Sequence, residues 1–150
     1  MTDNRAMEPT DAFAELALIR LADTDLRMVL QTIADLSRRT IPGAAEVSVT
    51  LVRDGKAHTT ASTGELALRL DEAQYDQGFG PCLDASADGV ALSLPDMAAE
   101  TRWPQWAKLA LDAGVGSSLS IGLPIQESAA GALNVYGTAA GAFDYDAITV

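Results

Sequence analysis

The clearest pattern along the chain is a long stretch of apolar residues at helical spacing. Apolar side chains recur every three or four residues over 25–40, which predicts an amphipathic helix that Pro42-Gly43 ends. A shorter stretch with the same spacing predicts a helix over 11–22. The residues before it are polar and aperiodic, so a flexible N-terminus is expected over 1–9.

The period changes to two between Glu46 and Ser62, where apolar and polar residues alternate. Asp54-Gly55 interrupts this alternation with the residue pair that a two-residue hairpin turn prefers. The pattern therefore predicts a β-hairpin, and its register places Thr50 opposite Thr59.

The remaining segments complete an order in which strands and helices are mixed. They are predicted to be a helix over 64–77, a loop over 78–89, a strand over 90–94, a helix over 103–113, strands over 115–125 and 132–137, and the opening of a helix over 144–150. Hairpins at both ends of this order imply a mainly antiparallel sheet, which needs helices on both faces. The predicted fold is α/β of the α+β type, in one domain over 10–150 whose last helix is cut short.

The alternating residues give the predicted sheet two unlike faces. One face carries bulky apolar side chains and should pack on the long helices. The other is small and polar, and carries Ser48, Thr50, Ser118, Ser120, Asn134 and Tyr136. Buried polar groups need partners. Two interpretations stay open: a wet face beneath a loop, or a pocket for a small ligand.

Charge and composition exclude several classes of function. The formal net charge is −11, from 10 basic and 21 acidic residues, which disfavours nucleic-acid binding. Acidic residues over 71–100 are interpreted as a solvated surface, and a cation or amine site is the alternative, although no calcium-loop spacing occurs among them. Cys82 is the single cysteine, so no intrachain disulfide can form and a reducing cytoplasm is expected. No apolar stretch is long enough to span a membrane.

Several short motifs occur in an order that resembles a known family. They are LD over 70–71 with QY over 74–75, YDQGFGPCLDA over 75–85, WP over 103–104, AGVGS over 113–117, LP over 123–124, GALNVY over 131–136 and AFD over 142–144. Together they resemble GAF domains of high-GC bacteria, of the kind that precede RNA-binding ANTAR domains in transcription antitermination regulators. The resemblance implies a five- to six-stranded, mainly antiparallel sheet between helices, and a homodimer formed through the N-terminal helices. It places any RNA-binding domain beyond Val150.

The resemblance also places the loop over 75–85 beside a pocket on the polar face of the sheet. The candidate ligand-binding residues are therefore Ser48, Thr50, Tyr75, Phe79, Cys82, Trp103, Ser118, Ser120, Asn134 and Tyr136. For the aromatic residues, core packing is the alternative. For Cys82, the alternatives are a buried inert thiol and a redox sensor, and acidic neighbours favour the inert thiol.

No catalytic set is found, so the sequence predicts no enzymatic activity. His58 is the only histidine and no His/Cys cluster exists, so no metal or cofactor is expected. The predicted function is a cytoplasmic signal-sensing domain that binds a small molecule or relays a partner's signal to an output domain outside this chain. A ligand-free homodimerisation module is the second hypothesis, and a sensor or reductase that uses Cys82 is the third.

Overall fold

The computed structural model describes residues 24–126 and 129–143. The strands are β1 (Glu46–Arg53), β2 (Lys56–Ser62), β3 (Ala91–Leu94), β4 (Ser117–Gln126) and β5 (Ala129–Gly137). The helices are α2 (Thr24–Thr40), α3 (Glu65–Gln77), α4 (Pro81–Asp88), the short 3-10 helix η1 (Met97–Ala99) and α5 (Pro104–Asp112). The elements predicted over 1–9, 11–22 and 144–150 lie outside the described residues.

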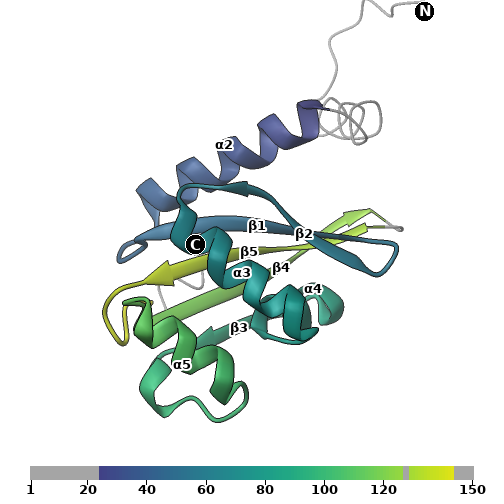
Figure 1. Cartoon of the computed structure of the whole chain (residues 1–150). Helices are drawn as coiled ribbons and strands as arrows, with labels where there is room; N and C mark the ends of the chain where they lie inside the picture. The colour runs from purple at the N-terminus through teal and green to yellow at the C-terminus, as the bar shows by residue number, and fades with distance from the viewer. Residues whose placement is uncertain (1–23, 127–128, 144–150) are drawn as a thin grey trace, which may run out of the picture.

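The five strands form one antiparallel sheet in the order β2-β1-β5-β4-β3. Helix α2 covers one face, and α3, α4 and α5 lie on the other (Figure 1). On the α2 side, Leu30 and Ala34 pack against Val47, Val49 and Val135 of the sheet. The predicted fold class, including the bulky apolar face beneath the long helix, is confirmed.

The structure confirms the hairpin that joins β1 to β2. Thr50 pairs with Thr59, and the pairing continues without a slip to Arg53 and Lys56 at the turn. Asp54 and Gly55 have φ angles of 55° and 74°, the left-handed pair that this turn type requires.

The predicted loop over 78–89 is wrong, because most of it forms helix α4. Pro81 occupies the first turn of this helix, where its fixed φ is favourable. The helix start is capped from outside, since the backbone N–H of Cys82 donates to Gln74 Oε1 of α3 at 2.9 Å. At Gly80 (φ 154°), a Cβ atom would collide with the Gln74 carboxamide that makes the cap, and the backbone angle also favours glycine. Capping by a distant side chain leaves no local signal in the sequence.

The apolar stripe of α2 divides between two directions. Leu30 is 5% exposed and faces the sheet, whereas Val29, Ile33 and Leu36 are 55%, 38% and 51% exposed. These three side chains and Met28 form what we call the α2 stripe. Exposed apolar residues at this spacing are typical of a helix that packs against a further partner.

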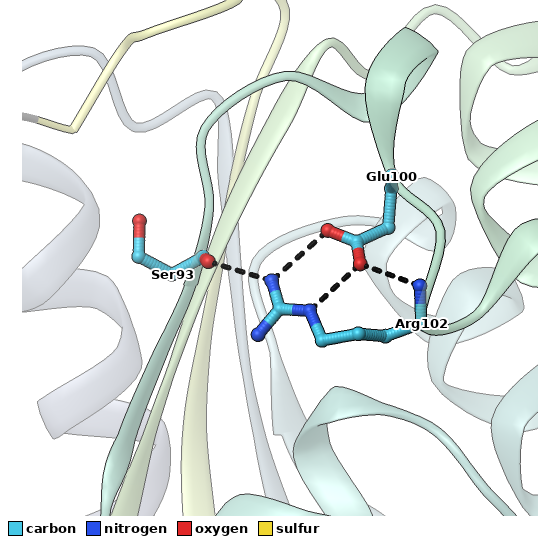
Figure 2. Close-up of polar contacts among 3 residues, drawn as sticks. All are labelled: Ser93, Glu100 and Arg102. Carbon is cyan, nitrogen blue, oxygen red and sulfur yellow. Dashed lines mark hydrogen bonds and ion pairs between the residues drawn. The ribbon is translucent and has the colours of Figure 1, made fainter.

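Both edges of the sheet are partly closed by side chains. At the β2 edge, the Gln31 carboxamide donates to Ser62 O at 2.9 Å and accepts from Ser62 N at 3.3 Å. At the β3 edge, Arg102 donates to Ser93 O while its guanidinium pairs with both oxygens of Glu100 (Figure 2). Such side chains occupy backbone groups that would otherwise pair with another strand.

Candidate functional site

Polar side chains collect between the sheet and helices α3 and α4. We call this group the polar layer. Its members are Ser48, Thr50, Thr59, Asp71, Gln74, Tyr75, Cys82, Ser118, Ser120, Asn134 and Tyr136. Most of them are completely or almost completely buried. The layer contains eight of the ten ligand-binding candidates that the sequence suggests.

Helix α3 carries Asp71 and Gln74 on its buried face. Its buried positions are Ala67, Leu70, Asp71 and Gln74, which recur at helical spacing. The start of the helix is fixed by Glu46 of β1, whose Oε1 accepts from the backbone N–H of Ala67 at 2.9 Å. This hydrogen bond ties the start of α3 to β1 of the sheet.

Hydrogen bonds of Asp71 and Tyr75 connect α3 to three strands. Asp71 Oδ1 accepts from the Tyr136 hydroxyl at 2.5 Å, and Asp71 Oδ2 accepts from Thr59 Oγ1 at 2.7 Å. The Tyr75 hydroxyl lies 2.8 Å from Thr59 Oγ1 and 2.7 Å from Thr50 Oγ1. A continuous network therefore crosses β2, β1 and β5.

The network continues along β5, where Asn134 Nδ2 donates to Thr50 Oγ1 at 2.9 Å and to Ser48 Oγ at 3.2 Å. The ring of Tyr136 is held in place by Trp106 of α5, with their centroids 6.3 Å apart. The indole N–H of Trp106 donates in turn to Leu70 O at 2.9 Å. Helix α5 thereby orients the tyrosine that reaches Asp71.

Burial dominates the electrostatics of Asp71. Removal from water raises the pKa of its carboxyl from 3.8 to about 6, although hydrogen bonds with Ser48, Tyr136 and Thr59 favour the ionised form. The negative charge of the neighbouring Glu72 adds to the rise. Asp71 is thus a buried acid that titrates close to neutral pH, whereas the sequence analysis placed it in a solvated acidic surface. That interpretation of Asp71 is wrong.

Three buried side chains of the layer have polar atoms without a hydrogen-bond partner. They are Gln74 Nε2, Ser118 Oγ and Asn134 Oδ1. Ser118 and Asn134 lie on adjacent strands, since Ser118 pairs with Tyr136 and Ser120 with Asn134. A buried polar atom without a partner has a free-energy cost of roughly 1–3 kcal/mol. These atoms need water or a polar ligand to satisfy them.

Cys82 is fully buried at the start of α4. Burial raises the pKa of its thiol, and the charge of Asp71 raises it further. The thiolate is the reactive form of cysteine. This environment therefore favours the inert thiol over the redox sensor.

The structure does not bring Phe79 and Trp103 into the layer. Phe79 is 45% exposed, at the turn between α3 and α4. Trp103 is buried at the start of α5, in an apolar cluster that includes Met97 and Val115, and Arg102 lies over its ring at 5.0 Å. Helices α3 and α4 cover the polar face of the sheet, and ligand binding there stays a prediction.

Shallow depressions lie along the outer edge of the layer. One, of about 330 Å³, is lined by Ala57, His58, Thr59, Leu68, Glu72, Tyr75 and Asp76. A second, of about 310 Å³, lies next to it and shares His58, Thr59 and Leu68. Thr59 and Tyr75 therefore belong both to the first depression and to the buried network.

Thr59, Asp71 and Gln74 belong to the polar layer but were not among the predicted site residues. The predicted hairpin register already paired Thr59 with Thr50, so its side chain could have been placed on the polar face. The spacing of Asp71 and Gln74 from Ala67 and Leu70 could have placed them on the inner side of α3. The capping role of Gln74 had no such signal.

Comparison with known proteins identifies the family. A family model described as "GAF domain" matches residues 23–150. The chain belongs to the GAF family. The polar layer is therefore enclosed within a GAF domain, a class of signal-sensing regulatory domain. Among curated proteins, none matches the chain at a significant level.

Solved structures with the same fold include a GAF domain region, a domain described as part of a sensor kinase, and an enzyme. The GAF domain region of a Geobacter sulfurreducens protein is 18% identical, with a TM-score of 0.63 and coverage of 83% of this chain and 84% of that one. A domain described as part of a two-component sensor histidine kinase from Sinorhizobium meliloti is 16% identical, with a TM-score of 0.60 and coverage of 81% and 79%. The type II free methionine-R-sulfoxide reductase of Thermoplasma acidophilum is 16% identical, with a TM-score of 0.62 and coverage of 82% of both chains. At these identities the likeness shows the fold alone.

The reductase corrects one prediction. The sequence analysis predicted no enzymatic activity, and this is contradicted because the GAF fold of this chain is also the fold of an enzyme. Within residues 24–126 and 129–143, no three His, Cys, Asp or Glu side chains are placed to hold a metal ion. No helix in this same part of the chain is long and apolar enough to cross a membrane.

Proposed function

We propose that this GAF domain senses a small molecule that binds in the polar layer, and that it passes the signal to an output domain. The observation that carries the proposal is the set of unpartnered buried atoms on Gln74, Ser118 and Asn134. A sheet face used only for packing would be expected to bury apolar groups or fully paired polar groups. Here a donor, a hydroxyl and an acceptor are left for a polar molecule.

The signal would be transmitted by a shift between two arrangements of the domain. A ligand shifts such an equilibrium only through different affinities for the two arrangements. Because α3 and α4 cover the layer, a ligand must move them relative to the sheet. The hydrogen bonds of Asp71 and Tyr75 join α3 to β1, β2 and β5, so these contacts would change with it.

The α2 stripe supports a homodimer formed through the N-terminal helices. Met28, Val29, Ile33 and Leu36 are large apolar side chains that α2 leaves exposed. A second copy of the chain would bury this surface. The domain would act in the cytoplasm, and its output would be transcriptional, through an antitermination domain of the ANTAR kind.

Native mass spectrometry of the purified chain tests this function. A co-purifying small molecule, absent from a Ser118→Ala and Asn134→Ala double variant that remains folded, is the expected result. A folded wild-type chain that binds no small molecule at any stage would instead support the ligand-free homodimerisation module. The masses report the oligomeric state in the same experiment.

A further inference from the structure

The charge of the polar layer points to the kind of molecule that it binds. In the contacts described for Asp71, the partners of its carboxylate are hydroxyl groups, and no Lys, Arg or His side chain is among them. Burial disfavours the ionised forms of Tyr75, Cys82 and Tyr136. Near neutral pH, the layer therefore carries one negative charge without a balancing cation.

We propose that the ligand of the polar layer is a small organic cation with a protonated amine, which Asp71 binds in place of a proton. The inference rests on the proposed function and names the class of its ligand. A buried carboxylate without a cation is unfavourable, and a bound cation would remove that cost. An anionic ligand would add a second negative charge to the same buried space.

The unpartnered atoms of the layer agree with this class. Ser118 Oγ and Asn134 Oδ1 can each accept a hydrogen bond, and both atoms are without a partner. A protonated amine has up to three N–H donors and no acceptor. Gln74 Nε2 is a donor without a partner, so the molecule should also carry an uncharged acceptor such as a carbonyl or hydroxyl oxygen.

The depression between α3 and β2 offers an approach for a cation. Glu72 and Asp76 line it, and its wall includes Thr59 and Tyr75, which are hydrogen-bonded to the buried network. Its lining contains no Lys or Arg side chain, and His58 is its one basic residue. A cleft lined by one sign of charge concentrates ligands of the opposite sign.

Replacement of the proton makes binding depend on pH. The titratable groups that face Asp71 are Tyr136 on β5, Tyr75 and Glu72 on α3, and Cys82 on α4. Since the cation binds the carboxylate form, acidification below the pKa of Asp71 should weaken binding. At pH 7.5, where Asp71 is already ionised, binding should release little or no proton.

Methylammonium chloride is a suitable probe. NMR of the Asp71 carboxyl carbon in the intact 150-residue chain measures the titration of Asp71 with and without it. The midpoint of the Asp71 titration should fall by about one pH unit when methylammonium is present at ten times its dissociation constant. Sodium acetate and acetamide at the same concentration should leave the midpoint unchanged. An equal shift with acetamide, or an unchanged midpoint at saturating methylammonium, overturns the proposal.

Two variants separate binding from folding. Ser118→Ala removes an unpartnered hydroxyl, so it should weaken methylammonium binding at least threefold while stability stays the same or rises. Asp71→Asn should abolish binding, and Asp88→Asn, the same change at an exposed position of α4, should have no effect. Equal affinities in wild type and Asp71→Asn would show that methylammonium binds elsewhere, against the proposal.

Native mass spectrometry distinguishes failure of this inference from failure of the proposed function. A co-purified neutral or anionic molecule that the Ser118 and Asn134 variants lose would overturn the cation and leave the sensing function intact. Absence of any bound molecule, together with an Asp71 titration midpoint that methylammonium does not change, would overturn both the cation inference and the proposed sensing function.

Discussion

Replacement of Asp71 by Asn should stabilise this domain at neutral pH, although the substitution alters a fully buried, hydrogen-bonded residue. Asparagine has nearly the same shape as aspartate. Its Oδ1 can accept from the Tyr136 hydroxyl, and its Nδ2 can donate to Thr59 Oγ1, which can then donate to Tyr75. The network therefore survives without the buried charge.

The magnitude follows from the pKa of Asp71. Burial raises this pKa from 3.8 to about 6. A difference of about two units between the folded and unfolded chains corresponds to about 3 kcal/mol of unfolding free energy. Because the folded pKa is the higher one, the folded chain binds the extra proton between pH 4 and pH 6. Stability falls as pH rises through this window, and the full cost is present above about pH 7.

Urea denaturation from pH 4.5 to pH 8, followed by tryptophan fluorescence, measures the effect. The free energy of unfolding of Asp71→Asn minus that of wild type should rise by about 1 kcal/mol per pH unit between pH 4.5 and pH 6. It should level off above pH 7, with the variant up to about 3 kcal/mol more stable than wild type. Asp88→Asn, which removes an exposed charge, should show no such rise.

The reasoning would be refuted if the difference in unfolding free energy between Asp71→Asn and wild type did not change between pH 5 and pH 8. It would also be refuted if the variant were less stable than wild type at pH 7.5. Either result would mean that the folded chain does not destabilise the ionised carboxylate. Equal urea m-values for the two proteins are required for the comparison, because the free energies come from extrapolation to water.

Three further predictions concern the contacts that hold α3 and α4. Gly80→Ala should destabilise the chain by roughly 2–3 kcal/mol in urea denaturation, because its Cβ would meet Gln74 and its φ disfavours other residues; an unchanged midpoint would contradict this. Glu46→Ala should lower the unfolding free energy by about 1 kcal/mol through loss of the cap at Ala67, and Glu46→Gln should recover part of the loss. Cys82 should react with a thiol reagent at neutral pH at least tenfold more slowly than in the urea-unfolded chain, because burial raises its pKa; equal rates would restore the redox hypothesis.

Much of the fold could be predicted because its signals are local. Asp54-Gly55 needs left-handed backbone angles, and this requirement fixed the hairpin register. Alternation along the strands separated the apolar face from the polar face, since side-chain direction in a strand has a period of two. The motif over 75–85 identified the family before its structural role was clear.

The same motif shows where local signals end. Its residues form the junction between α3 and α4. Pro81 and Gly89 are local signals for the two ends of α4 that the loop prediction did not weigh, whereas the cap from Gln74 depends on how the two helices pack. Helix α2 gives a second example. Its apolar spacing predicted a helix, and only the position of the sheet decided that Leu30 is buried while Val29 and Ile33 are exposed.

The sequence by itself determined most of the described elements, the two faces of the sheet and the family of this protein, because propensity, periodicity and turn geometry act over a few residues. The tertiary structure decided the environment of each polar side chain. Asp71 is one acid among many in the sequence, and it becomes the charged centre of the polar layer only when α3 packs on β1, β2 and β5. Desolvation depends on every atom that surrounds a group, and those atoms come from segments far apart in the chain.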